Sequence, residues 1–211
     1  MPRLMILMTL VLANSAVARD FAGYFMQPDE ELRLAATAGP ASVTADASYY
    51  TLTSQGFELA VAGSNQWHCF VERAFFARTA DANAYDTRIR APHCINEAGA
   101  KSRMQEVFMR TRLALEGLDQ ETIATRVNAA YESGALRLPE GLAMTYMMST
   151  EQYLGADAGA WHPHLMFWVP YLENDDVGGN AEMGRLPFVA PGSGTRSAVL
   201  IVAVEPLADD G

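Results

Sequence analysis

The chain has 211 residues, half of them apolar, and a formal net charge of −10 at pH 7. This composition is sufficient for a hydrophobic core of ordinary size, and the length predicts one domain rather than several. The acidic balance excludes nucleic acid and anionic membrane surfaces as natural partners, because the long-range field of the chain repels both.

The N-terminus has the three parts of an export signal. Arg3 supplies a positive charge, residues 4–13 an apolar core, and residues 16–18, Ala-Val-Ala, a small-residue cleavage site. The apolar core is about half the roughly 20 residues that a membrane-spanning helix needs. We therefore predict a signal peptide over 1–18 and a mature domain over 19–211 that is periplasmic or secreted and does not insert into the membrane.

The next segments predict one helix and then three strands. The sequence indicates a helix over 28–38. It would begin at Pro28, carry three acidic residues in its first turn and stop at Gly39-Pro40. Apolar alternation then indicates three strands, at 42–52, 57–61 and 67–73, with turns at 55–56 and 63–65. Successive strands joined by short turns are expected to form a meander.

Cys69 and Cys94 are the two cysteines of the chain. An isolated pair in an exported protein predicts a disulfide, since the compartment is oxidising. The bridge closes a loop of about 26 residues and stabilises by roughly 3 to 4 kcal/mol in the chain-entropy model. Residues 74–93 lack a clear period and are expected to form a long loop tied back to the third strand.

The second half begins with a predicted helical hairpin. One helix runs from Asn96 to Gly117, and a second is capped by Asp119 and stops at Gly134. Strands follow at 142–149, 164–169 and 197–204, and the nearly continuous apolar character of the last is typical of a central strand. Helices and strands in separate blocks predict an α+β fold, a mostly antiparallel sheet with the helical hairpin packed on it and one disulfide.

The stretch WHPHLMFW, residues 161–168, allows two interpretations. Pro163 cannot donate to a strand ladder, which favours a strand that begins there and enters the core. The alternative is a metal site, because the disulfide would hold His68 and His93 in one neighbourhood and His162 and His164 could join them. That interpretation predicts a divalent metal such as zinc or copper, and a metal-binding protein or metal-dependent hydrolase.

Residues 170–196, rich in Pro, Gly, Asn and Asp, are long enough to be a functional loop. We predict that this loop binds an unknown small molecule or protein partner. The candidate binding residues are Asp175 and Asp176 in the loop and, at nearby strand ends, Trp161 and Trp168. The competing interpretation places both tryptophans in the core. No catalytic motif such as Gly-x-Ser-x-Gly or Ser-x-x-Lys is present, so the chain is expected to be a binding domain without a cofactor rather than an enzyme.

Three stretches, AATAGPASVTADAS, GSNQWHC and PHLMFWVP, resemble a group of exported bacterial proteins. That group has a Gly-x-Asn-x-Trp-x-Cys segment and a later Pro-His-hydrophobic-Met segment, and the similarity runs over most of the mature chain. The resemblance implies one exported domain and supplies no catalytic residues. It suggests that Trp67, Cys69 and His164 matter together.

Overall fold

The computed structural model describes residues 20–76, 83, 85–156, 161–179, 186–190 and 192–205. The predicted signal peptide lies outside these residues. Within them, no helix is long and apolar enough to cross a membrane.

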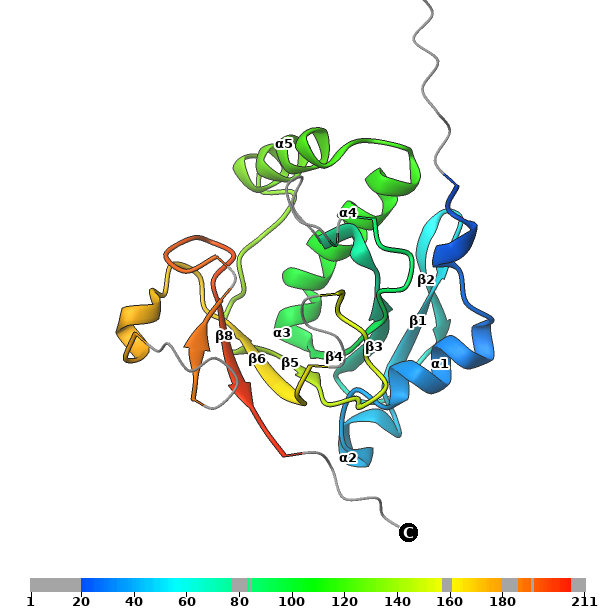
Figure 1. The fold of residues 1–211 in the computed structure, drawn as a ribbon, viewed down its shortest axis with the longest axis horizontal. Helices are drawn as coiled ribbons and strands as arrows, with labels where there is room; N and C mark the ends of the chain where they lie inside the picture. The colour runs from blue at the N-terminus through cyan, green and yellow to red at the C-terminus, as the bar shows by residue number, and fades with distance from the viewer. Residues whose placement is uncertain are drawn as a thin grey trace, which may run out of the picture.

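An eight-stranded sheet runs through the molecule in the order β2-β1-β3-β4-β5-β6-β8-β7 (Figure 1). All neighbouring strands pair antiparallel except β1 and β3, which are parallel. The predicted α+β class with a mostly antiparallel sheet is confirmed. The strands are β1 (Ser48–Thr53), β2 (Gly56–Val61), β3 (Trp67–Glu72), β4 (Ala91–Asn96), β5 (Ala143–Met147), β6 (His164–Trp168), β7 (Phe188–Val189) and β8 (Val199–Ala203).

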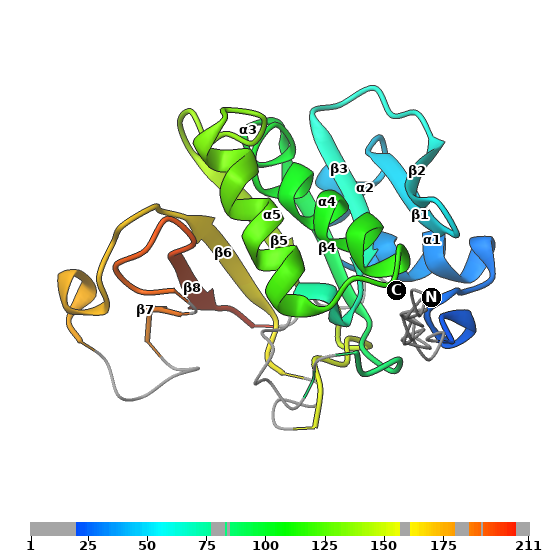
Figure 2. The same cartoon turned by 90° about the horizontal axis from the view of Figure 1, so that it is seen from above.

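Helices cover both faces of the sheet (Figures 1 and 2). On one face, α1 packs chiefly on β1, β3 and β4; on the other, α4 and α5 form the predicted hairpin. The single helix predicted from Asn96 to Gly117 is wrong in its first turns, because a turn at Lys101 and Ser102 divides it into α3 and α4. Asp119 caps α5 as predicted, since its Oδ1 accepts a hydrogen bond of 2.7 Å from the Thr122 backbone N–H. The helices are α1 (Pro28–Ala36), α2 (Ala41–Thr44), α3 (Glu97–Ala100), α4 (Arg103–Leu115) and α5 (Gln120–Glu132), with short 3₁₀ turns η1 (Ala22–Tyr24), η2 (Ala74–Phe76) and η3 (Asn174–Val177).

The predicted strand over 42–52 is wrong in its first half, where α2 replaces it and β1 begins only at Ser48. The alternating positions there are Val43 and two alanines, and alanine favours a helix over a strand. Pro40 precedes the first residue of α2 and occupies the extended N-cap position. The alternation in this segment therefore reflects a small helix followed by a turn.

The predicted meander is also wrong, because β3 lies beside β1 and not beside β2. The turn before β3 is held against the start of β1: the backbone N–H groups of Ser64 and Asn65 donate to the Asp46 carbonyl at 2.9 and 3.1 Å. A Cβ on Gly63 would lie 2.3 Å from the carbonyl carbon of Ala47, so only glycine permits this approach. The chain thus crosses from β2 to the far side of β1.

The structure differs from prediction in three further places. The last strand, β8, is not central: it lies between β6 and the two-residue edge strand β7, which was not predicted. Its first three side chains alternate between buried and half-buried, and the last two are half-buried. The expected loop over 74–93 ends earlier than predicted, because β4 begins at Ala91.

The predicted disulfide between Cys69 and Cys94 is confirmed. The two residues lie directly opposite each other on β3 and β4, with their Cα atoms 4.1 Å apart, and both are fully buried. They pack under α1 with other small apolar residues. The disulfide therefore joins the two central strands of the N-terminal half inside the core.

A fully buried ion pair lies beside this core. The Arg73 Nη2 and Glu31 Oε1 atoms are 2.8 Å apart, and both side chains have 0% exposure. Arg73 Nε also donates to the Tyr24 carbonyl at 2.8 Å, and the Leu52 backbone N–H donates to Glu31 at 3.3 Å. The pair connects α1, β1 and the residue after β3. Burial lowers the pKa of Arg73 to about 10 and raises the pKa of Glu31.

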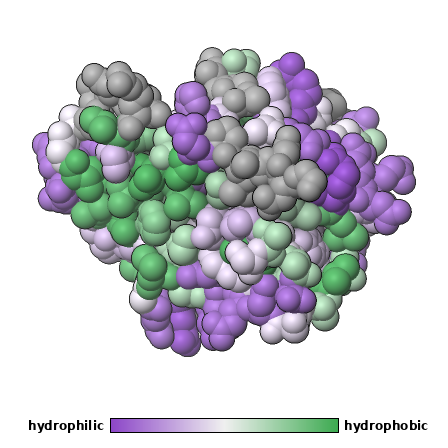
Figure 3. Space-filling model, turned by 90° about the horizontal axis from the view of Figure 1, so that it is seen from below, coloured by the Kyte–Doolittle hydropathy of each residue, from purple (hydrophilic) through white to green (hydrophobic). Residues whose placement is uncertain are grey.

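The two ends of the sheet differ in the side chains that they expose. Along the β6–β8 pair, the side chains of Leu165, Phe167, Leu200 and Val202 share the face that α1 and α2 leave free, and each is half-buried. Figure 3 shows apolar residues gathered at this end of the molecule. At the opposite edge, β2 is largely exposed from its third residue onward.

Candidate functional site

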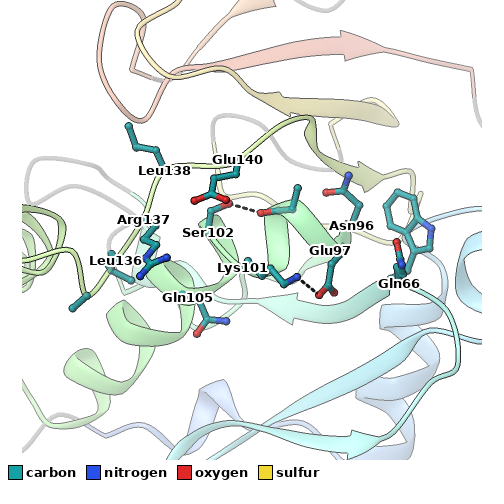
Figure 4. Close-up of a pocket in the computed structure, with 13 residues that line it drawn as sticks. Gln66, Asn96, Glu97, Lys101, Ser102, Gln105, Leu136, Arg137, Leu138 and Glu140 are labelled. Atoms are coloured by element: carbon teal, nitrogen blue, oxygen red, sulfur yellow. Dashed lines mark hydrogen bonds and ion pairs between the residues drawn. The ribbon is translucent and has the colours of Figure 1, made fainter.

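A groove with a volume of about 910 Å³ lies between the first residues of α3 and α4 and the segment that follows α5. In Figure 4, Gln66 stands at one end of the groove, and Leu136 and Arg137 stand at the other. Small-molecule sites typically have volumes of roughly 300 to 1,000 Å³. The groove is lined by Gln66, Trp67, Asn96, Glu97, Ala98, Lys101, Ser102, Gln105, Ala135, Leu136, Arg137, Leu138 and Glu140.

Asn96, the last residue of β4 and the N-cap of α3, organises one wall of the groove. Its Oδ1 accepts hydrogen bonds of 3.1 Å from the backbone N–H groups of Gly99 and Met144, and its Nδ2 donates to the Leu142 carbonyl at 2.8 Å. A Cβ on Gly99 would lie 2.3 Å from Ile95 Cγ1. The glycine therefore lets α3 pack closely on β4, which fixes the position of this wall.

Glu97 is the anionic centre of that wall. Its Oε1 lies 2.9 Å from Lys101 Nζ, and its Oε2 lies 3.0 Å from His68 Nε2. His68 Nδ1 in turn lies 3.1 Å from the Tyr50 hydroxyl. The hydrogen bonds from Lys101 and His68 lower the pKa of Glu97. Both carboxylate oxygens are thus engaged, and the charges of Glu97 and Lys101 offset each other.

Three exposed side chains of the groove remain uncommitted. Gln66, Arg137 and Glu140 have no hydrogen-bond or ion-pair partner within the described part of the chain. They offer an amide, a guanidinium and a carboxylate. The free groups of the groove can therefore donate to and accept from a polar ligand, and carry one charge of each sign.

A buried network lies behind the Arg137 end of the groove. Glu106 of α4 accepts from Arg103 Nη1 at 2.8 Å, from Arg110 Nε at 2.8 Å and from the Tyr131 hydroxyl at 2.9 Å. Burial alone would raise the pKa of Glu106, but the guanidinium groups of Arg103 and Arg110 outweigh it and lower the pKa to about 2. Glu106 therefore stays ionised and holds both arginines in place.

The four histidines lie in four different environments. His68 belongs to the groove wall; His93 Nε2 lies 3.0 Å from Glu72 Oε2 and its ring stacks on Phe70. His164 is buried, with Nδ1 2.8 Å from the His162 carbonyl, whereas the His162 side chain is exposed. Within the described ranges, no group of three or more His, Cys, Asp or Glu residues could hold a metal ion. The structure does not bring the four histidines together as one set of ligands.

Burial lowers the pKa of His164 from 6.5 to about 4, and the charge of His93 adds to the effect. The unfolded chain takes up this proton as the pH falls below about 6.5, whereas the folded chain does not until about pH 4. We expect His164 to contribute stability that is complete above pH 6.5 and is lost on acidification, on the order of 2 to 3 kcal/mol by pH 4.

Urea unfolding at pH 7.5, 5.5 and 4.0 measures this loss in the wild type, in His164→Gln and in the exposed control His162→Gln. The wild type and the His162 variant should lose more stability than the His164 variant. Equal losses in all three proteins would contradict the assignment.

The residues predicted to bind a ligand at 161–176 do not converge on one cleft. Trp168 is half-buried, with Nε1 donating to Thr145 Oγ1 at 3.1 Å, and Trp161 is half-buried against His164. Asp175 and Asp176 are exposed in η3, where Asp176 accepts from the Glu173 backbone N–H at 2.8 Å. Both tryptophans thus pack in the core at the β6 end, and the aspartates belong to a solvated turn.

Sequence reasoning missed most of the groove. Part of one wall could have been found from the sequence. Asn96 is a residue type that favours the N-cap position, and Glu97 and Lys101 are spaced four residues apart, as an ion pair on a helix requires. Gln66 and residues 135–140 come from distant parts of the chain, and no local pattern joins them to α3. Of the residues that the resemblance groups together, Trp67 and Cys69 lie on the α1 face of the sheet, whereas His164 lies on the opposite face.

No protein-family model matches this chain, and neither a curated protein nor a solved structure matches it. The resemblance to exported bacterial proteins stays a prediction. The function is therefore inferred from residues and geometry alone.

Proposed function

We propose that this chain is an exported protein, periplasmic or secreted, that binds a small polar ligand in the groove between α3, α4 and residues 135–140. The N-terminal segment with its cleavage signal and the buried disulfide support the compartment, since disulfides persist in oxidising surroundings. The ligand is a molecule with several hydrogen-bonding groups, because eight of the thirteen lining residues are polar or charged.

One observation carries the proposal: a groove large enough for a small molecule contains three polar side chains that have no partner among the described residues. They lie beside other side chains that are held by their own hydrogen bonds. Uncommitted groups next to a fixed wall are what a binding site needs, because the ligand gains hydrogen bonds without breaking existing ones. Gln66 and Glu140 come from separate segments of the lining. A ligand that reaches both would lie along part of the groove.

The test uses the ¹⁵N-labelled protein purified after export and a panel of free amino acids, dipeptides, monosaccharides and hydroxy acids at 10 mM. Binding is expected to shift the backbone amide signals of Ala98, Gly99 and Leu138. The double variant Gln66→Ala/Glu140→Gln should weaken binding at least tenfold. The matched control, Gln55→Ala/Glu132→Gln, changes exposed residues outside the groove and should leave affinity unchanged.

Two results would overturn the proposal. One is a panel in which no class of compound shifts the groove amides. The other is a ligand whose affinity is the same in the groove variant and in the control variant, because that ligand binds elsewhere.

A further inference from the structure

The sheet has an open edge at β2, which lies at one margin of the molecule in Figure 1. β2 is the first strand in the sheet order, and among the described residues it pairs with β1 only. Sheet edges are commonly protected by lysine, by proline or by a strand too short to pair. β7 is short in this sense, whereas β2 has six residues, Gly-Phe-Glu-Leu-Ala-Val, without lysine or proline. The β2 edge therefore has space for a further strand.

The pairing with β1 shows which backbone groups of β2 are free. Residue pairs of an antiparallel ladder alternate between bonded and non-bonded pairs, and the two-residue turn makes Thr53 and Gly56 a bonded pair. Glu58 is the next bonded residue of β2, and the register shift of the ladder comes only after Leu59. The N–H and C=O groups of Phe57 and Leu59 therefore point away from β1, to the open side.

These free groups define the chemistry of the occupant. Phe57 and Leu59 each offer one N–H donor and one C=O acceptor, spaced two residues apart along the edge. Another extended polypeptide backbone has donors and acceptors at the same spacing and can pair with them as an added strand. The groups on this edge thus match a peptide in extended conformation.

A hollow of about 320 Å³ lies beside the start of β2, on the α4 side of the sheet. Phe57 marks this side, because its ring stacks on Phe108 of α4 with the ring centres 4.7 Å apart. A strand added to β2 has every second side chain on the same side, next to the hollow. The hollow is lined by Gln55, Gly56, Phe57, Gln105, Phe108, Met109, Arg112, Ala135 and Leu136.

Arg112 gives the hollow a positive charge. It is the one charged residue of the lining, it is exposed, and it has no hydrogen-bond or ion-pair partner for its side chain in the described part of the chain. Gln55 and Gln105 in the same lining are neutral. An uncommitted guanidinium in this position favours a carboxylate on the partner.

A second copy of this chain does not fit the edge as well as a peptide of another protein. On the α4 side, β2 presents Phe57 and Leu59, whereas Glu58 lies on the opposite face. A copy paired through β2 would therefore bring no carboxylate to Arg112. Two copies with a net charge of −10 each also repel at long range.

We propose that the open edge of β2 binds an extended peptide segment of a partner protein, which adds a strand to the sheet and places an acidic side chain beside Arg112. Backbone pairing supplies affinity in this mode of recognition, and pockets for alternate side chains supply specificity. The inference goes beyond the proposed function and does not depend on it, because the small-molecule groove and the β2 edge can be occupied separately.

The probe is a phage-displayed library of linear decapeptides, selected on the folded, disulfide-bonded protein. Enriched peptides are expected to alternate apolar and polar residues and to contain Asp or Glu. One enriched peptide is then synthesised with blocked ends and added at saturation to the ¹⁵N-labelled protein. Hydrogen exchange of the Phe57 and Leu59 amides should slow at least tenfold, whereas the amide of Glu58, which is already bonded to β1, should change little.

Two variants of Leu59 separate backbone pairing from side-chain contact. Leu59→Pro removes an N–H group that faces solvent, which an edge strand tolerates, and should weaken peptide binding at least tenfold. Leu59→Thr keeps the N–H group and should bind within threefold of the wild type. The dispersion of the backbone amide spectrum shows whether each variant is folded.

A second pair of variants tests the charge. Arg112→Gln should weaken binding of the acidic peptide about threefold to fivefold, as expected for an exposed ion pair. The matched control, Arg126→Gln, changes an exposed arginine of α5 outside the hollow and should leave affinity unchanged.

A library from which no peptide is enriched would overturn the proposal. So would wild-type affinity in Leu59→Pro, or equal weakening in Leu59→Pro and Leu59→Thr, because strand pairing would then not carry the binding. Sedimentation of the free protein tests the other occupant: a dimer that Leu59→Pro converts into a monomer would assign the edge to a second copy. Peptide binding at β2, combined with a panel in which no small molecule binds the groove, would reject the proposed function alone.

Discussion

Replacing Glu31 by leucine is expected to destabilise the protein by about 3 to 5 kcal/mol, because it leaves the charge of Arg73 buried without its carboxylate. Both side chains of this pair have 0% exposure, so water cannot take the place of the missing partner. Arg73→Met should cost a similar amount, since Glu31 is then left buried and the Tyr24 carbonyl loses its donor.

Guanidinium chloride unfolding of a double-mutant cycle measures the coupling between the two residues. The double variant Glu31→Leu/Arg73→Met should be more stable than the sum of the single effects predicts, because no unpaired charge remains. The control is Arg33→Ala, which removes the exposed partner of Glu151, with side chains 56% and 49% exposed. It should cost less than about 1 kcal/mol. Additive effects at Glu31 and Arg73 would show that the ion pair is not coupled.

Removal of the disulfide by the double variant Cys69→Ala/Cys94→Ala is expected to lower the free energy of unfolding by about 3 to 4 kcal/mol. The bridge closes a sequence separation of 25 residues, and the chain-entropy model gives roughly this value for such a loop. The two cysteines already face each other in the β3–β4 ladder, so the folded state keeps its strand register without the bond.

Urea unfolding of the oxidised protein, the reduced protein and the alanine variant provides the measurement. Reduction and substitution should lower stability by similar amounts, because both release the same constraint on the unfolded chain. A variant within about 1 kcal/mol of the oxidised protein would contradict the entropic account. A folded alanine variant with unchanged β3–β4 backbone contacts would confirm that the ladder sets the register.

Local patterns predicted those parts of the fold that local chemistry determines. The cap at Asp119, the acidic first turn of α1 and the Cys69–Cys94 pair were predicted from the sequence, and each is present in the structure. Strand neighbours were not readable where a long-range contact decides them. The parallel pairing of β1 with β3 depends on the approach of Gly63 to Ala47, which a turn signal alone does not reveal.

The candidate site was harder to predict for the same reason. The tryptophans and the long loop predicted a binding site at the β6 end, but Trp161 and Trp168 pack against the core there. The groove instead gathers single residues from the turn before β3, from α3 and from the segment after α5.

The unequal edges of the sheet bear on self-association. At one edge, β7 has only two residues, which leaves too few free backbone groups to template another strand. At the other edge, β2 has six residues and exposes Leu59 and Val61, at 55% and 43%. Of the two edges that the structure describes, β2 is therefore the natural starting point for strand-to-strand aggregation of the folded protein at high concentration. A lysine or proline within β2 is the substitution that would suppress it.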